Sequence, residues 1–213
     1  MKITLIDAGK RYNRDWIFRH FHYEFQQGQH YAITGPNGSG KSTLLQSVAG
    51  AIGISEGSLR YELATHPVRE VAPDLAFKHL SLAAPYLELI EEMTAAEFLE
   101  FHQQFKPLLS SLSIAQIIQQ VGLEGAAHKQ IRYYSSGMKQ RVKLAQAIFS
   151  DTPVVLLDEP CTNLDAEGIA LYQRLIQDYC NQRLVIVSSN DIQEYAFCRE
   201  RLSILDYKTK AKI

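Results

Sequence analysis

The chain has 213 residues, a length that fits one domain or one domain with a small insertion. Hydrophobic residues make up 46% of the sequence and charged residues 21%, which excludes a disordered, collagen-like or low-complexity chain. The 22 basic and 23 acidic side chains give a formal net charge of −1, so we expect no nucleic-acid partner.

Cysteine usage and hydropathy indicate a reduced, cytoplasmic setting. Cys161, Cys180 and Cys198 lie far apart and form no CxxC pair, so neither a disulfide framework nor a zinc site is predicted. The N-terminus turns polar after a short apolar stretch, unlike a signal peptide. No run approaches the roughly 18 apolar residues that a membrane span needs.

The first third of the chain is predicted to be rich in strands. Apolar runs and alternating polar and apolar residues predict strands at 3–6, 16–25, His30–Thr34, 58–63 and 74–82. A helix is expected to begin at Ser42, where Leu44, Leu45 and Val48 share one face.

The middle of the chain is predicted to be mostly helical. Thr94 and Glu97 form a capping-box pattern before an apolar helical repeat. Further helices are expected at 113–121 and 136–149.

The remainder alternates strand and helix, with strands at 154–157, Leu184–Ser188 and 202–205 and a helix at Ala166–Tyr179. The fold class predicted is α/β, with a mostly parallel sheet, an antiparallel N-terminal part and a helical insert. We interpret 1–213 as a single domain with a core at about 1–83 and 150–213 and a helical subdomain at about 84–149.

A glycine-rich segment between the third predicted strand and the first predicted helix fits the pattern GxxxxGK[ST]. Such a loop surrounds phosphate oxygens with backbone amides, and the helix N-terminus adds partial positive charge. Lys41 is expected to reach the β- and γ-phosphates, and Ser42 to ligate Mg²⁺. The predicted nucleotide-binding residues are Gly35, Pro36, Asn37, Gly38, Ser39, Gly40, Lys41, Ser42 and Thr43.

A buried apolar strand ends in Asp158 and Glu159. Parallel sheets place ligands at the carboxyl ends of their strands, so both acids are expected beside the phosphate loop. Asp158 would hold Mg²⁺, and Glu159 would orient or deprotonate the attacking water. The loop and the acids together predict a P-loop protein that binds a nucleoside triphosphate with Mg²⁺; the loop alone does not say which enzyme.

Between these motifs, residues 134–141 read YSSGMKQR and open a helix. This segment resembles the signature motif of the ATP-binding cassette (ABC) ATPases, and residues 162–165, TNLD, resemble the D-loop of that family. The order of the motifs also matches, and the resemblance covers essentially the whole chain.

The resemblance implies a dimer that closes around two ATP molecules. Each ATP would lie between the phosphate loop of one cassette and the signature residues of the other, Ser135, Ser136, Gly137 and Met138. Asn163 and Asp165 would belong to the D-loop. Tyr12 is expected to stack on the adenine; Trp16 is the rival, although its alternating context predicts a core position.

Two positions depart from the family pattern. The family has a Gln near 84–86, where this chain has Ala84, Pro85 and Tyr86. Glu88 is open to two interpretations, a substitute oxygen ligand or a charged loop residue, and the second is preferred. Asn190 stands where the family has a His, and an amide carries neither a proton nor a charge. We therefore predict slow hydrolysis with ATP binding retained, with Glu159 and Asn190 as the catalytic residues.

The resemblance implies the motor subunit of a membrane transporter. The membrane spans are expected in a permease on a separate chain, whose coupling helix would dock around 84–105, and the cassette is expected on the cytoplasmic face of the cell membrane. The form of the signature resembles exporter subunits, and pairing as a homodimer or a heterodimer stays open. The alternative is a soluble ABC ATPase of cofactor assembly, repair or the ribosome; a P-loop kinase or GTPase would not explain the signature and D-loop.

Overall fold

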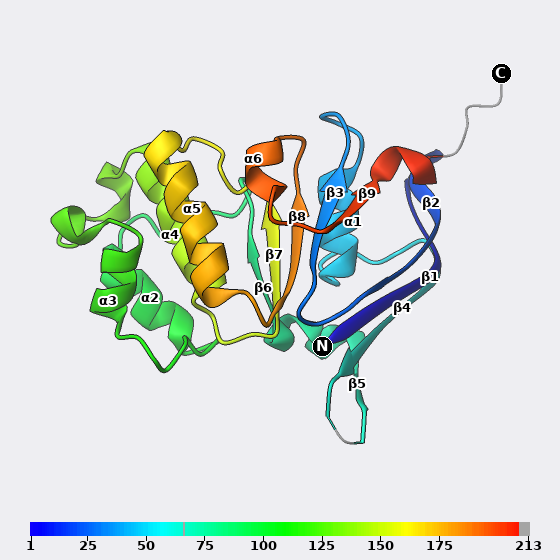
Figure 1. Cartoon of the computed structure of the whole chain (residues 1–213), viewed down its shortest axis with the longest axis horizontal. Helices are drawn as coiled ribbons and strands as arrows, with labels where there is room; N and C mark the ends of the chain where they lie inside the picture. The colour runs from blue at the N-terminus through cyan, green and yellow to red at the C-terminus, as the bar shows by residue number, and fades with distance from the viewer. Residues whose placement is uncertain (66, 209–213) are drawn as a thin grey trace.

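The computed structural model describes residues 1–65 and 67–208. An antiparallel sheet forms the right-hand side of Figure 1. In it β1 (Lys2–Tyr12) pairs with β2 (Asp15–Phe25) and with β4 (Glu56–Leu63), and β4 pairs with β5 (Arg69–Val71). β1 is longer than the strand expected at 3–6, because left-handed backbone at Asp7 (φ 48°) shifts the alternation of its side chains.

The second sheet is parallel and has the order β6–β7–β8–β3–β9. Its strands are Leu80–Ala83, Val154–Asp158, Leu184–Ser188, His30–Thr34 and Glu200–Ser203, in that order. β7 and β8 are buried along their whole length, which is why both read as continuous apolar runs. The predicted α/β fold class is confirmed.

The core lies on both faces of the parallel sheet. Val155 and Leu157 of β7 belong to the cluster that includes α4 (Ser136–Ile148) and α5 (Ala166–Tyr179). Val154 and Leu156 belong to the cluster shared with α1 (Lys41–Val48) and the antiparallel sheet. The carboxyl edge of the parallel sheet is therefore held by packing on both sides, and it is this edge that carries the predicted motifs.

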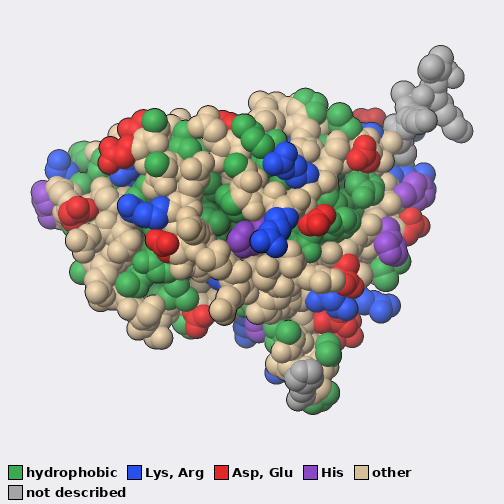
Figure 2. Space-filling view, in the orientation of Figure 1, with side chains coloured by type: hydrophobic (Ala, Val, Ile, Leu, Met, Phe, Trp, Pro, Cys, Tyr) green, Lys and Arg blue, Asp and Glu red, His purple; other side chains and the backbone are tan. Residues whose placement is uncertain are grey.

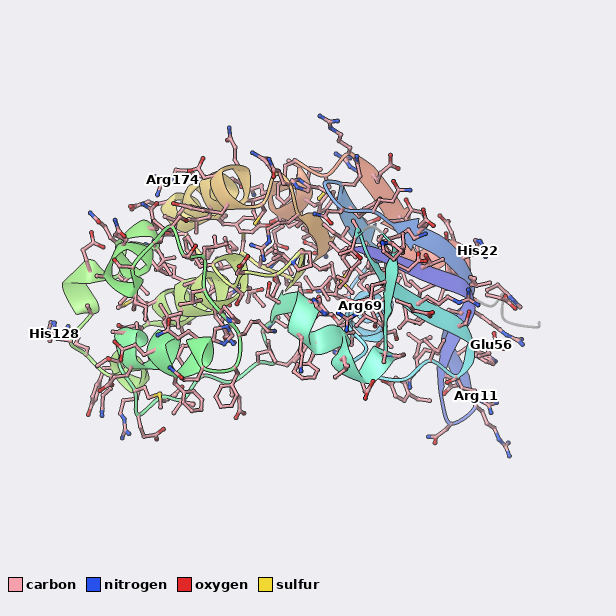
Figure 3. The ribbon with its side chains drawn as sticks, turned by 90° about the horizontal axis from the view of Figure 1, so that it is seen from below. Arg11, His22, Glu56, Arg69, His128 and Arg174 are labelled. Carbon is pink, nitrogen blue, oxygen red and sulfur yellow. The ribbon has the colours of Figure 1, made fainter. Side chains whose placement is uncertain are left out.

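The stretch between β6 and β7 contains α2 (Ala95–Gln103), α3 (Ile114–Gln120), α4 and the short 3₁₀ segments Glu124–Ala126 and Ile131–Tyr133. The capping box at Thr94 is confirmed, since the Thr94 hydroxyl accepts from the Glu97 amide and the Glu97 carboxylate accepts from the Thr94 amide. Figure 3 places His128 at one end of the molecule and Arg11 and Glu56 at the other. The division into a core and a subdomain at 84–149 stays a prediction.

Two predicted strands are partly wrong. Residues Pro73–His79 form a 3₁₀ helix and only Leu80–Ala83 form the strand, because Pro73 fixes φ in the first turn and the Leu75 amide donates to the Ala72 carbonyl at 2.9 Å. The strand expected at 202–205 is Glu200–Ser203, followed by a 3₁₀ turn at Ile204–Tyr207. There the Ser203 hydroxyl accepts from the Leu205 amide at 3.3 Å and ends the strand.

The described surface carries mixed charge. Figure 2 shows acidic and basic side chains interspersed over one face, with no large patch of a single sign, in keeping with the net charge of −1. Within residues 1–65 and 67–208, no helix combines the length and the apolar character needed to span a bilayer.

His102 of α2 is a half-buried histidine within a small hydrogen-bond network. Its Nε2–H donates to the Ser150 hydroxyl at 2.9 Å, and the Gln146 amide lies 3.2 Å from its Nδ1, which fits a neutral ring. Burial, followed by the charge of Lys106, lowers the pKa of His102 to about 4. The folded chain therefore binds this proton less readily than the unfolded chain, whose histidines titrate near 6.5.

We therefore predict that stability falls as the pH drops from about 6.5 to 4 and that the loss is complete below 4. The expected contribution is roughly 1–2 kcal/mol after allowance for partial exposure. Urea unfolding at pH 7 and pH 5 measures it, with His102→Gln as the comparison. The prediction is wrong if both proteins lose the same stability between the two pH values.

Candidate functional site

The predicted phosphate loop joins β3 to α1 and curves around a cavity of about 240 Å³. Gly40 has φ 99°, and a Cβ there would lie 2.3 Å from the Ile17 side chain, so this position accepts only glycine. The Lys41 side chain is buried, and its ammonium donates to the carbonyls of Gly35 at 2.9 Å and Pro36 at 3.3 Å. The cavity is lined by Ile17, Asn37, Gly38, Gly40, Lys41, Ser42, Thr43 and Glu159.

This cavity brings together predicted residues that are far apart in the sequence. Glu159 meets the loop because β7 and β3 end at the same edge of the parallel sheet, with β8 between them. Gly35, Pro36 and Ser39 belong to the turn but do not line the cavity. Ile17, which also lines it, was not predicted, and no pattern in the sequence distinguishes it from a core residue.

Asp158 has the properties of a cation ligand. The side chain is 2% exposed, and its Oδ1 has no hydrogen-bond partner among the described residues. A buried carboxylate oxygen without a partner is costly unless a positive charge satisfies it. Ser188, its neighbour in the β7–β8 register, also has a buried hydroxyl with no partner. The donor set of oxygen atoms at this edge fits Mg²⁺.

Glu159 follows Asp158 with left-handed backbone, φ 44°. Its amide donates to the Ser188 carbonyl at 2.9 Å, which holds the turn against β8. This conformation is uncommon for a residue with a Cβ, and Glu159 in this conformation lines the phosphate cavity.

Asn190 lies in the loop after β8 and reaches the phosphate loop. Its amide Nδ2 donates to Asn37 Oδ1 at 3.2 Å, and both side chains are exposed. A neutral amide therefore lies beside the loop, at the position where a histidine was expected from the resemblance.

The signature residues and the D-loop share a second cavity, of about 330 Å³. Ser135 caps α4, its hydroxyl accepting from the Met138 amide at 3.2 Å. A Cβ on Gly137 would lie 2.9 Å from the Asn163 carbonyl, so the two segments pack backbone to backbone. The cavity is lined by Ser135, Ser136, Gly137, Met138, Arg141, Asn163, Leu164 and Asp165. The two cavities have no lining residue in common, so one chain does not bring the signature to its own phosphate loop.

Tyr12 and Trp16 occupy opposite faces of the β1–β2 hairpin. Tyr12 is 49% exposed, with the Lys10 ammonium 5.0 Å from its ring centroid. A Cβ on Gly9 would contact the Trp16 ring, so Trp16 lies on the same face of the hairpin as Gly9. Successive residues of a strand alternate between faces, so Lys10 lies on the opposite face. The core position expected for Trp16 is wrong: the ring is half-buried, with the guanidinium carbons of Arg11 and Arg19 at 5.5 and 4.5 Å from its centroid.

The physical reason for this error is a bulge. Lys10 pairs with Phe18 and Arg11 with Trp16, which leaves Ile17 without a partner and reverses the alternation on the hairpin tip. Tyr12 is exposed but does not line the phosphate cavity, whereas Ile17 does.

Tyr86 stands in the segment where the family Gln is missing. Burial and then the negative charge of Asp158 raise the pKa of Tyr86 to about 12, and a hydrogen bond with Gln46 opposes them. This segment therefore offers a partly exposed phenol where the family has an amide. Glu88 lies instead in a separate cavity of about 420 Å³ with Lys139 and Lys143, as a charged loop residue would.

The fold and the first cavity define a phosphate-binding α/β protein of the P-loop class, with acids at the strand ends that suit a hydrated cation. The sequence model of the ABC transporter family matches residues 18–162. The chain therefore belongs to this family, and it is an ABC-type ATPase.

Individual relatives agree with this assignment. The uncharacterized ABC transporter ATP-binding protein YybJ of Bacillus subtilis is 30% identical over 190 residues, which cover 88% of this chain and 85% of YybJ. The cytochrome c biogenesis ATP-binding export protein CcmA of Agrobacterium fabrum is 31% identical over 193 residues, covering 89% and 88%. The dimeric structure of MJ0796, a bacterial ABC transporter cassette, has a TM-score of 0.79 at 22% identity, covering 94% and 93%, and supports the fold.

Proposed function

We propose that this chain is the ATP-hydrolysing motor subunit of a membrane exporter and that two cassettes close around two Mg-ATP molecules. The observation that carries the proposal is the pair of separate half-sites, one with the phosphate loop and one with the signature. The phosphate loop of each cassette would be completed by the signature residues of a second cassette. The relative named as an export protein supports the direction of transport.

The phosphate loop would hold ATP through its backbone amides and Lys41, with Tyr12 against the adenine. Ser42 and Asp158 would hold Mg²⁺, which supplies charge neutralisation at the phosphates when it is bound. Glu159 would orient or deprotonate the attacking water, and Asn190 would donate a hydrogen bond toward the γ-phosphate. In the partner cassette, the amides at the start of α4 and the Ser136 hydroxyl would bind the same phosphate.

A permease on a separate chain would dock beside the cavity of about 420 Å³. Its lining combines apolar and charged side chains, namely Pro85, Leu87, Glu88, Leu89, Glu91, Lys139 and Lys143, and suits an amphipathic segment. Lys143 Nζ donates to the Pro85 carbonyl at 2.8 Å, and Lys139 Nζ makes an ion pair with Glu91. Both lysines belong to α4, the helix that begins with the signature residues. Movement of α4 would therefore be transmitted to the docking segment through these two contacts.

ATP-driven closure is tested by size-exclusion chromatography with light scattering. We expect Glu159→Gln to shift from monomer to dimer with Mg-ATP and to remain monomeric with Mg-ADP. Ser136→Glu, made in the same background, should abolish the dimer while ATP still binds. The acid suits a helix N-terminus, so folding is preserved, but it repels the partner's γ-phosphate. A dimer that forms equally with Ser136→Glu would contradict the sandwich.

The transporter role is tested on membranes. We expect the chain to remain with the membrane fraction after a wash in high salt and to bring a multi-span protein with it on purification. Release of the chain by salt, with closure around ATP intact, would favour a soluble ABC ATPase instead.

Asn190→His tests the prediction of slow hydrolysis. The imidazole would add a group that can carry a proton and a charge beside the phosphate loop, so we expect the steady-state rate to rise roughly threefold or more. Asn190→Gln, which keeps the amide, is the control and should not exceed the parent. An unchanged or lower rate for Asn190→His means that the amide is not what limits hydrolysis.

A further inference from the structure

Glu194 is a buried carboxylate close to the acidic edge of the sheet. It lies on α6 (Ile192–Tyr195), the short helix that follows the Asn190 loop, and is 5% exposed. Its Oε1 accepts a hydrogen bond from the backbone amide of Cys161 at 2.7 Å. Burial raises the pKa of Glu194, while hydrogen bonds from Ser189 and the Cys161 amide oppose the shift.

The bond to Cys161 fixes the turn that carries Glu159. Cys161 is two residues beyond Glu159, whose own amide is held by the Ser188 carbonyl at 2.9 Å. The strained turn at 159–161 is thus held at two points, and both come from the segment that runs from β8 into α6. Strained backbone persists only where the surroundings hold it in this way.

Glu194 is itself held firmly in place. The buried Tyr172 hydroxyl of α5 donates to its carbonyl at 2.8 Å. Asp191 caps the short helix by accepting from the Gln193 amide at 2.9 Å. Four residues before Glu194, Asn190 reaches Asn37 of the phosphate loop. One rigid segment therefore touches the phosphate loop at one end and the catalytic turn at the other.

We propose that Glu194 is a positioning residue that keeps Glu159 and Asn190 in register, through its hydrogen bond to the amide of Cys161. A buried acid is costly, and an apolar side chain would fill the same space more cheaply. What the acid adds is a strong acceptor for a backbone amide that would otherwise be buried without a partner. This inference rests on the ATPase function, but part of its test does not depend on activity.

The test compares Glu194→Leu, which removes the acceptor, with Glu194→Gln, which keeps an acceptor oxygen. Gln193→Leu is the matched control, because its exposed side chain lies in the same short helix. We expect kcat of Glu194→Leu to fall roughly tenfold or more, with KM for ATP within about twofold, since the phosphate loop is unchanged. Glu194→Gln should retain kcat within about threefold, and Gln193→Leu should match the parent.

Hydrogen exchange measured by mass spectrometry gives the readout that is independent of activity. The peptide containing Cys161 should exchange faster in Glu194→Leu than in the parent, and Glu194→Gln should keep its protection. If the parent does not hydrolyse ATP but the variants still show this exchange pattern, the proposed function is refuted and the positional role of Glu194 stands.

A double-mutant cycle tests the register itself. Asn190→Ala should reduce kcat several-fold in the parent and have little further effect in Glu194→Leu, because residues that act as a unit are not additive. The proposal is overturned if the effects of Asn190→Ala and Glu194→Leu on kcat multiply in the double variant. It is also overturned if Glu194→Leu lowers the melting temperature without lowering kcat, or if Glu194→Gln is as slow as Glu194→Leu.

Discussion

Glu159→Gln should lower the rate of ATP hydrolysis at least about 100-fold while ATP binding stays within about threefold of the parent. The amide has the size of the carboxylate but cannot accept a proton from water. The turn at Glu159 is held through its backbone amide and Cys161, so the substitution leaves the cavity intact. Single-turnover hydrolysis of radiolabelled ATP measures the rate, and equilibrium binding of a fluorescent ATP analogue measures the affinity.

Glu167→Gln is the matched control, because Glu167 is an exposed acid in the first turn of α5. It should hydrolyse ATP at the parental rate. Hydrolysis by Glu159→Gln at that same rate would remove Glu159 from the mechanism and leave the phosphate loop and Mg²⁺ as the source of catalysis.

Arg183→Met should be the most destabilising of the single substitutions considered. The buried Arg183 guanidinium donates to the carbonyls of Ile148, Ser150 and Thr152 and to the Thr152 hydroxyl, at 2.5–2.9 Å. These bonds fix the end of the signature helix to the loop before β7. Because removal leaves several buried carbonyls without a partner, we expect a loss of about 3–5 kcal/mol in the free energy of unfolding.

Urea unfolding at pH 7 measures this loss, and the melting temperature should fall by roughly 6–20 °C for a chain of this size. Arg174→Met is the control, since Arg174 is exposed on α5, as Figure 3 shows, and should change stability by less than about 0.5 kcal/mol. Equal stability of the two variants would mean that water replaces the lost hydrogen bonds.

Most of the fold follows from local patterns. The helix at Ala166–Tyr179 and the strand at Leu184–Ser188 were predicted with their observed bounds, because capping residues and continuous burial leave a clear record in the sequence. The errors arose where backbone geometry departs from regular periodicity. Ile17 forms a bulge that leaves no pattern different from a strand. Pro73 does signal the start of a helical turn, but the apolar residues after it also fit a strand.

The site was predictable at the level of motifs. The phosphate loop and Glu159 are short patterns whose chemistry depends on residue type and spacing, and the structure places Glu159 against the loop. Tyr86 and Glu194 were not predicted, because their significance depends on which groups they face. The charge of Asp158 helps raise the pKa of Tyr86, and Glu194 accepts a hydrogen bond from the amide of Cys161.

Composition, length and charge by themselves determined only a chain of single-domain size with an even charge balance, and the strand and helix patterns along the chain predicted the α/β class. Motif order indicated the family, because the phosphate loop, the signature and the acidic strand end are short local patterns. Each can be recognised in the sequence without knowing which residues lie next to it in space. Only the tertiary structure decided that the phosphate loop and the signature line separate cavities. It also decided that Asn190 contacts Asn37 and that the buried Glu194 accepts a hydrogen bond from the amide of Cys161. These contacts depend on the order of strands in the parallel sheet, which here joins residues 33 and 153 positions apart and leaves no periodic signal in the chain.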